Sequence, residues 1–404
     1  MIESGAMNYR CKKQSTIFVA IVFAGTILGL MACTPITTPL PQGAVESDGN
    51  TPDRLQSVTE ITEITPIESD PVTKPIPKEG DSSGEAVINP LTGQLAQKGD
   101  RLVYRPIIIK VTLYPRNNRP QWGLSQADIV YEHYTEGGLS RFSALYYGQE
   151  AEIVGPIRSA RLVDIQLVRM YGALFAYGSA DYRVLEQIDN SEFVNRAVRE
   201  FPAGCPPLCR IDPTGQNHLV TDTQALRAFY EGRGIDLSAP NLEGMLFDTS
   251  PPANGESGTQ LMITYSEDNF HEWVYVPETG SYHRSQENGE GPGQVTPLTD
   301  RTTGEPIESN NVVLLKVPHD LYARTPEIID IQLYGEGEGI ALRDGVAYEV
   351  RWIRPFPAGV LYLTHPDGSK YPFKPGRTWF ELVGTSSNIG HESEDRWVVS
   401  FDQP

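Results

Sequence analysis

Residues 155–181 read GPIRSARLVDIQLVRMYGALFAYGSAD, and they set the fold class of this chain. Apolar residues recur at helical spacing over 162–171, after a tight turn that carries two arginines and a serine. The apolar run 173–177 predicts a buried strand, and a polar loop then begins a second helix that ends near residue 188. This alternation predicts at least one βαβ unit.

The sequence on both sides of residues 155–181 predicts further strands and one further helix. Runs rich in β-branched and aromatic residues predict strands at 107–111, 129–134 and 139–147, with a Gly-Gly hairpin between the last two. If 142–147 and 173–177 are parallel neighbours, the loops after them open on one carboxyl edge, where α/β sheets bind ligands. After a short helix at 223–230, closely spaced strands and Gly-rich turns predict a mostly β region. The predicted fold class is therefore α+β: an α/β N-terminal domain with a mixed sheet, followed by a smaller mostly β domain.

The N-terminus has the layout of an export signal. Basic residues precede the apolar run 17–31, which is shorter than the about 20 residues of a membrane span. The run ends Leu30-Met31-Ala32-Cys33, which resembles a bacterial lipobox and predicts cleavage before Cys33 and lipidation of that cysteine. A plain signal peptide or an uncleaved anchor is the alternative.

The domain boundaries follow from changes in composition. Residues after Cys33 are rich in Pro, Thr and acidic side chains and lack aromatics, which predicts a disordered tether. The predicted segments are 1–32 signal peptide, 33–88 tether, 89–230 α/β domain, 231–254 linker and 255–404 mostly β domain.

The charge and the cysteines exclude several classes of function. A net charge of −19 argues against a nucleic-acid partner, because such binding needs clustered Lys and Arg. Neither the cysteines nor the scattered histidines have metal-site spacing, so no metal or cofactor is expected. Cys205 and Cys209 lie in a proline-kinked loop of an exported chain, which predicts a local disulfide.

The concentrated arginines predict a site for an anion. Arg158 and Arg161 stand at a predicted helix start with Ser159 as its N-cap, where guanidinium groups and free N–H groups together favour phosphate or carboxylate. The loop with Ser179 and Asp181 is expected opposite them. Arg116 and Arg119 are further candidates. The alternative is that one or both of Arg158 and Arg161 pair inside the fold with the carboxylates Glu132, Glu136, Asp164 or Asp181.

Two enzymatic readings are weaker. Glu132 and Glu136 could form a glycosidase pair, but four residues of strand, at about 3.3 Å each, separate them by roughly 13 Å. The hairpin predicts Arg141 between them on the same face, across from Tyr134, so an ionic ladder is favoured. A second reading assembles Ser159, His218 and Asp181 as a hydrolase triad, although the chain has no G-x-S-x-G elbow.

Several motifs together resemble a known family. They are Asn89-Pro90-Leu91-Thr92-Gly93, the run from Arg119 to Glu132, Glu136-Gly137-Gly138, the stretch Gly155–Arg161, Tyr282-x-Arg284 and Pro375-Gly376-Arg377-Thr378-Trp379. This pattern is similar to the YerB-type bacterial lipoprotein family, whose N-terminal and C-terminal portions have no established biochemical function. Members tend to have Pro-His-Asn where this chain has Gln216-Asn217-His218, which puts a role for His218 in doubt.

These observations favour an extracytoplasmic lipoprotein on the outer face of the cytoplasmic membrane. We expect a cell-envelope binding or accessory protein whose partners are the membrane, through the lipid anchor, and an anionic cell-wall ligand or an envelope protein. The alternatives are an envelope hydrolase or transferase that uses Glu or Asp for acid/base work, and a scaffold for a membrane protein. Both a binding protein and an enzyme are therefore compatible with the sequence.

Overall fold

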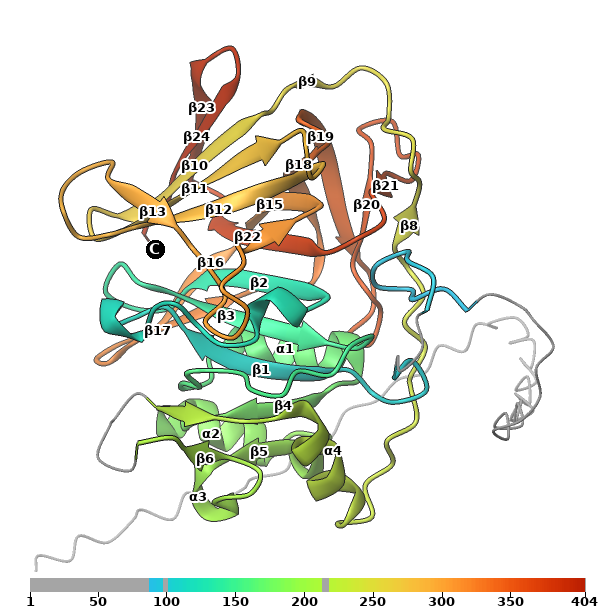
Figure 1. Ribbon diagram of the computed structural model, residues 1–404, viewed down its shortest axis with the longest axis vertical. Helices are drawn as coiled ribbons and strands as arrows, with labels where there is room; N and C mark the ends of the chain where they lie inside the picture. Colours follow the sequence, from blue (N-terminus) through green and yellow to red (C-terminus); the bar gives the residue numbers. More distant parts are fainter. Residues whose placement is uncertain (1–86, 97–100, 213–217, 404) are drawn as a thin grey trace, which may run out of the picture. The chain divides into compact units, whose positions relative to one another are not determined.

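Strands from both halves of the chain form one central sheet. The computed structural model describes residues 87–96, 101–212 and 218–403. Within these residues the largest sheet has 11 strands in the order β20-β19-β18-β15-β22-β2-β3-β1-β4-β5, with β9 beside β19 (Figure 1). The strands are β1 (Ile107–Thr112), β2 (Ile129–Tyr134), β3 (Ser140–Tyr146), β4 (Leu174–Tyr177), β5 (Ala197–Arg199), β9 (Glu256–Ser257), β15 (Asn311–Val317), β18 (Gly335–Arg343), β19 (Val346–Arg354), β20 (Tyr362–Thr364) and β22 (Thr378–Gly384).

The central sheet mixes parallel and antiparallel pairs. The strands β4 and β5 run parallel, and the helix α2 connects them, which forms a βαβ unit. The helices are α1 (Leu162–Tyr171), α2 (Tyr182–Asp189), α3 (Glu200–Ala203) and α4 (Thr223–Glu231), with 3-10 turns η1 (Arg116–Asn118), η2 (Leu124–Gln126) and η3 (Val194–Arg196). The predicted α+β class, with its mixed sheet and βαβ unit, is confirmed.

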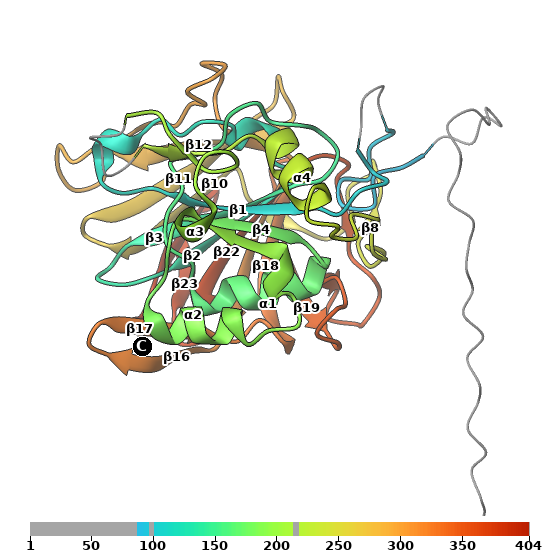
Figure 2. The ribbon, with the colours of Figure 1, turned by 90° about the horizontal axis from the view of Figure 1, so that it is seen from below.

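A second sheet covers one face of the central sheet. Its 7 strands come from the C-terminal half, in the order β13-β12-β11-β10-β24-β23, with β14 beside β12. They are β10 (Gln260–Ser266), β11 (Asn269–Val276), β12 (Ser281–Glu287), β13 (Val295–Pro297), β14 (Glu308–Ser309), β23 (Asn388–Ser393) and β24 (Arg396–Ser400). Trp273 of this sheet packs on Trp379 of β22, with ring centroids 5.1 Å apart. Helices α1 and α2 lie on the opposite side of the central sheet (Figure 2).

Three short strand pairs complete the fold of the described residues. They are β16 (His319–Arg324) with β17 (Glu327–Ile331), β6 (Cys209–Arg210) with β7 (Leu219–Val220), and β8 (Leu246–Phe247) with β21 (Pro372–Phe373). The hairpin of β16 and β17 packs on α1. Because both faces of the central sheet are covered, β1, β2 and β22 are buried along their whole length and are largely apolar.

The two halves meet inside the central sheet. Strand β22, near the C-terminus, lies between β2 of the N-terminal half and β15, and it runs parallel to both. The backbone N–H of Gly376 also donates a hydrogen bond to the carbonyl of Thr92, which links the two halves at this junction. The boundaries 89–230, 231–254 and 255–404 stay predictions, and the signal peptide and tether of residues 1–86 lie outside the described residues.

The expected pairing of the strands at 142–147 and 173–177 is wrong. Strand β1 lies between them, antiparallel to β3 and parallel to β4. The Ile-rich β1 is buried on both faces, and this burial favours a central place in the sheet. The crossover through α1 therefore passes over β1, and the parallel pair of this region is β1 with β4.

The hairpin register also differs from the prediction by one residue. Arg141 pairs with His133, and Tyr134 pairs with Ser140. The backbone N–H of Thr135 donates to the carbonyl of Leu139, so the connection has three residues, with Gly137 and Gly138 both at positive φ. A shift of one residue reverses the face of every side chain, and Glu132 therefore points away from Arg141.

Candidate functional site

The stretch Gly155–Arg161 lies between the carboxyl ends of β1 and β4. The N–H of Arg158 donates to the carbonyl of Lys110 on one side, and the N–H of Gly178 donates to the carbonyl of Arg158 on the other. The N–H of Ala160 likewise donates to the carbonyl of Ser179. Backbone bonds therefore fix this stretch on both sides at the carboxyl edge of a parallel strand pair.

Helix α1 begins after Arg161, and the prediction of Ser159 as its N-cap is wrong. The N–H of Arg161 donates to Asp164 Oδ2 at 2.6 Å, and the N–H of Asp164 donates to the carbonyl of Arg161. Asp164 is a carboxylate in the first turn, where the N–H groups of the helix favour negative charge. Ser159 Oγ is instead 3.2 Å from Ser179 Oγ, as expected for facing loops.

Arg158 is a cation without an anionic partner. Its half-buried guanidinium makes no hydrogen bond or ion pair within the part of the chain that the structure describes. Burial and the charge of Arg210 both lower the pKa of Arg158, and Arg158 in turn lowers the pKa of Arg141. The electrostatic neighbours of Arg158 are therefore themselves cations.

Arg141 and Arg161 share a single carboxylate, Glu136. Arg141 Nη2 lies 3.0 Å from Glu136 Oε1, and Arg161 Nε donates to Glu136 Oε2 at 2.8 Å. Burial alone would raise the pKa of Glu136, but the hydrogen bonds and charges of the two arginines outweigh it and lower this pKa. The predicted alternative, in which arginines pair with Glu136, therefore holds for Arg141 and Arg161 but not for Arg158.

Three of the four arginines at this edge have carboxylate partners. Arg210 pairs with Glu200 at 2.5 Å, and Arg141 and Arg161 share Glu136, whereas Arg158 has no carboxylate partner among the described residues. Burial and Arg161 lower the pKa of Arg141, which stays charged at neutral pH because a guanidinium holds its proton.

A buried polar network lies beneath this edge, and Asp164 is its only member among the residues singled out from the sequence. Lys110 Nζ donates to Ser143 Oγ at 2.9 Å and to Asp164 Oδ1 at 3.0 Å, and it also contacts His133 Nε2. Burial lowers the pKa of Lys110 to about 8 against the pull of Asp164, and it lowers that of His133 well below its usual value. The available signal was a lysine within the apolar run 107–111.

Asp181 and His218 do not join Ser159. Asp181 caps α2 and pairs with Arg183 at 2.8 Å. His218 Nδ1 lies 3.5 Å from Asp212 Oδ2. Among residues 101–212 and 218–403 no hydrogen bond links Ser159, Asp181 and His218, so the structure does not assemble the proposed triad.

Arg116 and Arg119 belong to a different group. Both pair with the buried Glu287 of β12, at 2.7 Å and 2.6 Å. Arg116 also contacts Asp268, and the ring of Tyr114 lies under the Arg119 guanidinium at 4.6 Å. The four predicted ligand-binding arginines therefore do not converge, and carboxylates of the second sheet neutralise this pair.

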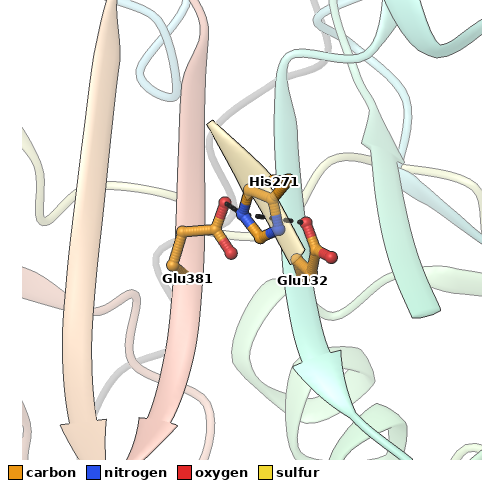
Figure 3. A group of neighbouring side chains, drawn as sticks. All are labelled: Glu132, His271 and Glu381. Atoms are coloured by element: carbon orange, nitrogen blue, oxygen red, sulfur yellow. Dashed lines mark hydrogen bonds and ion pairs between the residues drawn. The ribbon is translucent and has the colours of Figure 1, made fainter. Parts of the chain in front are cut away.

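Glu132 lies in a buried cluster between the two sheets. In Figure 3, His271 of β11 stands between Glu132 of β2 and Glu381 of β22. His271 Nε2 is 2.9 Å from Glu381 Oε1 and 3.8 Å from Glu132 Oε2. Arg284 Nη2 lies 2.9 Å from Glu132 Oε2, and the rings of Phe142, Trp273 and Trp379 surround its guanidinium at 5.2–5.6 Å. All four charged or titratable side chains are fully buried.

The cluster has the residue types of a metal site, but its surroundings fit a metal poorly. A divalent cation at Glu132 and Glu381 would lie within a few ångströms of the buried Arg284 cation. Acceptors at Glu132, Glu381 and His271 lack hydrogen-bond partners within the described chain, and so do donors on Arg284. Buried water satisfies unpaired donors and acceptors together, whereas a metal satisfies only acceptors. We derive no metal-dependent chemistry from this cluster.

Burial sets the protonation of the cluster. It raises the pKa of Glu381 to about 7 against the charge of Arg284, and it raises that of Glu132. Burial and Arg284 lower the pKa of His271 to about 3, so the imidazole is neutral. Glu132 and Glu136, the proposed glycosidase pair, thus lie on opposite faces, and only Glu136 reaches the surface.

The loop that precedes Arg210 contains the predicted disulfide. Cys205 and Cys209 are bonded, with Cα atoms 4.6 Å apart. Cys209 pairs with Val220 and Arg210 with Leu219, and the carbonyl of Leu219 accepts from the N–H of Ile157. The disulfide therefore closes the loop that holds Arg210 beside the Gly155–Arg161 stretch. The lipidation residue Cys33 lies outside the described residues.

The helices of the described residues are too short or too polar to cross a membrane. Two family models match the chain: protein of unknown function (DUF3048), N-terminal domain, over residues 91–236, and its C-terminal domain over residues 261–380. A relative named "Putative lipoprotein YerB", from Bacillus subtilis (strain 168), is 28% identical over 73% of this chain and 85% of its own length.

A solved structure also matches this chain. The crystal structure of YerB protein from Bacillus subtilis matches with a TM-score of 0.63 and 27% identity, over 74% of this chain and 96% of that chain. The first family model covers the N-terminal strands of the central sheet, and the second covers most of its C-terminal strands. The crystal structure matches 74% of the chain. The chain therefore belongs to the YerB-type family, built from the N-terminal and C-terminal DUF3048 domains.

Proposed function

We propose that this protein is a membrane-anchored lipoprotein of the cell envelope that binds an anionic group at the Gly155–Arg161 stretch. The observation that carries the proposal is Arg158, a half-buried cation whose electrostatic neighbours are cations. A charge removed from water and left without a partner is costly, and an anion beside it would recover that cost. The anchor is proposed from the lipobox-like sequence at Cys33 and from the name of the YerB relative.

The chemistry of the edge favours phosphate or carboxylate. Guanidinium groups donate paired hydrogen bonds that match the oxygens of both. Ser159 and Ser179 place two hydroxyl groups 3.2 Å apart beside the arginines. We infer that the ligand is a polyanion of the cell wall, since an anchored protein meets such polymers outside the membrane.

Binding of defined polyanions tests the proposal. The probes are a poly(glycerol phosphate), which presents phosphodiesters, and a polygalacturonate, which presents carboxylates, titrated calorimetrically at low and moderate salt. Arg158→Ala is expected to weaken binding of the true ligand at least tenfold, and Arg158→Lys to restore part of it. The matched control is Arg169→Ala, because Arg169 is partly exposed and pairs with Glu192 away from this edge.

Two results would contradict the proposal. One is equal affinity of the Arg158→Ala and Arg169→Ala variants for both polymers. The other is turnover of purified wall material by the unmodified chain that disappears in Glu136→Gln, which would favour the envelope hydrolase. The anchor has its own test: Cys33→Ser should abolish fatty-acid labelling of the protein and release it from the membrane fraction.

A further inference from the structure

Three polar residues from distant parts of the chain meet at the amino edge of the central sheet. Asp128, Asn310 and Arg377 each stand immediately before one of the parallel strands β2, β15 and β22. The first residues of these strands, Ile129, Asn311 and Thr378, are in register. The three preceding residues are therefore neighbours, although 249 positions separate the first from the last.

These residues line a pocket of about 390 Å³ at the junction of the two halves. Such a volume lies within the range of small-molecule sites, which often form where domains meet. Its lining is almost wholly polar, and Ala127 is the single apolar side chain among the lining residues. The other contributors are Thr92, Gln94, Ser125, Gln126, Gln149 and Glu308.

The charges of the pocket are already compensated by one another and by the backbone. Arg377 Nη2 donates to Glu308 Oε1 at 2.7 Å, and Arg377 Nη1 donates to the carbonyl of Ser125. The carboxylate of Asp128 accepts from Asn89 Nδ2 at 2.8 Å and from the N–H of Tyr147 at 2.7 Å. Because these groups already have partners, the pocket does not favour a charged ligand.

The polar side chains of the pocket that remain free to bind a ligand are amides. The side chains of Gln94 and Gln149 make no hydrogen bond within the described residues, and Gln126 makes one long contact of 3.5 Å. Each amide offers a donor and an acceptor in one plane. A neutral ligand whose groups both donate and accept matches this set, and the hydroxyl groups of a sugar have that property.

We propose that this pocket binds an uncharged saccharide through Gln94, Gln126 and Gln149. The lining has no aromatic ring or aliphatic wall, which disfavours acyl chains and aromatic ligands. The site lies at the opposite edge of the sheet from Arg158, because β1 and β2 both run antiparallel to β3. The saccharide site is therefore independent of the proposed anion site.

Saturation-transfer NMR and calorimetry with soluble oligosaccharides of N-acetylglucosamine test this site in the purified chain. The double variant Gln94→Ala, Gln149→Ala is expected to weaken binding at least tenfold. Both side chains are exposed, so the fold should be retained, as thermal unfolding would check. The matched control is Gln187→Ala, which removes an amide elsewhere, and Arg158→Ala should leave saccharide binding unchanged.

The results that would overturn the saccharide site differ from those that would overturn the anion site. No binding of neutral oligosaccharides at millimolar concentration, or unchanged binding in the double variant, would overturn the saccharide site. Tighter binding of a short uncharged peptide than of any oligosaccharide would overturn it as well. Loss of polyanion binding in Arg158→Ala without loss of saccharide binding would support both sites separately.

Discussion

Glu132 and Glu381 lie opposite each other on the paired parallel strands β2 and β22, and both carboxyl groups are fully buried. Arg284 and His271 reach them from the second sheet. With His271 neutral, two ionised carboxylates and one guanidinium would leave a net negative charge in the interior. Burial therefore favours a proton on the pair, which raises the pKa of Glu381 to about 7.

Glu381→Gln should change how stability depends on pH. The folded protein holds the Glu381 proton up to about pH 7, whereas the unfolded chain releases it near 4.5. The stabilisation from this proton is complete below pH 4.5 and is lost as the pH rises through 7. The free energy of unfolding of the native chain relative to Glu381→Gln should fall over this window by roughly 3 kcal/mol, at about 1.4 kcal/mol per pKa unit.

The measurement is urea unfolding of both chains at several pH values. His271 acts in the opposite direction: its pKa is lowered to about 3, so its stabilisation is lost as the pH falls below 6.5. The two effects oppose each other between pH 4.5 and 6.5, and His271→Gln is therefore the informative control. A constant difference between the native chain and Glu381→Gln from pH 4 to 8 would contradict the prediction.

Glu136→Gln should strengthen polyanion binding. Glu136 is the shared partner of Arg141 and Arg161, and its neutralisation frees two guanidinium groups. We expect a gain of about 1 kcal/mol, or roughly fivefold in Kd, that decreases with added salt. Calorimetry with the same polymers measures it, with Glu192→Gln as the matched control, since Glu192 pairs with Arg169. Weaker binding would show that Glu136 contributes to the site.

The pair of Lys110 and Asp164 should stabilise the fold cooperatively. Lys110→Met leaves the buried Asp164 carboxylate without its cation, and Asp164→Asn leaves the buried lysine without its anion. Each single change should cost about 3–5 kcal/mol, because an unpaired buried charge is strongly destabilising. The double variant should cost less than the sum of the two. A double variant that costs as much as the two single changes added together, measured by chemical denaturation, would show that the two side chains act independently.

Removal of the disulfide should weaken both ligand binding and stability. Cys205→Ser with Cys209→Ser opens a loop of five residues, whose closure is worth about 2 kcal/mol by loop entropy. Because this loop holds Arg210 beside Arg158, we expect severalfold weaker polyanion binding. Calorimetry and thermal unfolding of the double variant, compared with the reduced native chain, measure both effects. Unchanged binding would place Arg210 outside the site.

Local patterns in the sequence predicted the elements well. The helix at 162–171 begins and ends where the periodicity indicated, and the strands at 107–111 and 129–134 match β1 and β2 closely. The approach of Ser159 to Ser179 and the bond between Cys205 and Cys209 were also foreseen. These features depend on short-range periodicity and turn chemistry, which neighbouring residues encode.

The errors arose where the answer depends on pairing between distant segments. The three-residue turn moved Arg141 by one position, so Glu132 joined the interior instead of an ionic ladder. The insertion of β1 separated β3 from β4, and Glu287 of the second sheet neutralised Arg116 and Arg119. None of these partners lies within the sequence windows from which local structure can be predicted.

The sequence by itself determined the fold class, the main helices and strands of the N-terminal half, and the cationic character of the stretch Gly155–Arg161. The tertiary structure alone decided which charges are neutralised. Arg141 and Arg161 share Glu136, whereas Arg158 has no carboxylate in the described chain. The physical reason is that an ion pair requires contact within about 4 Å, and sheet register and strand order set that distance.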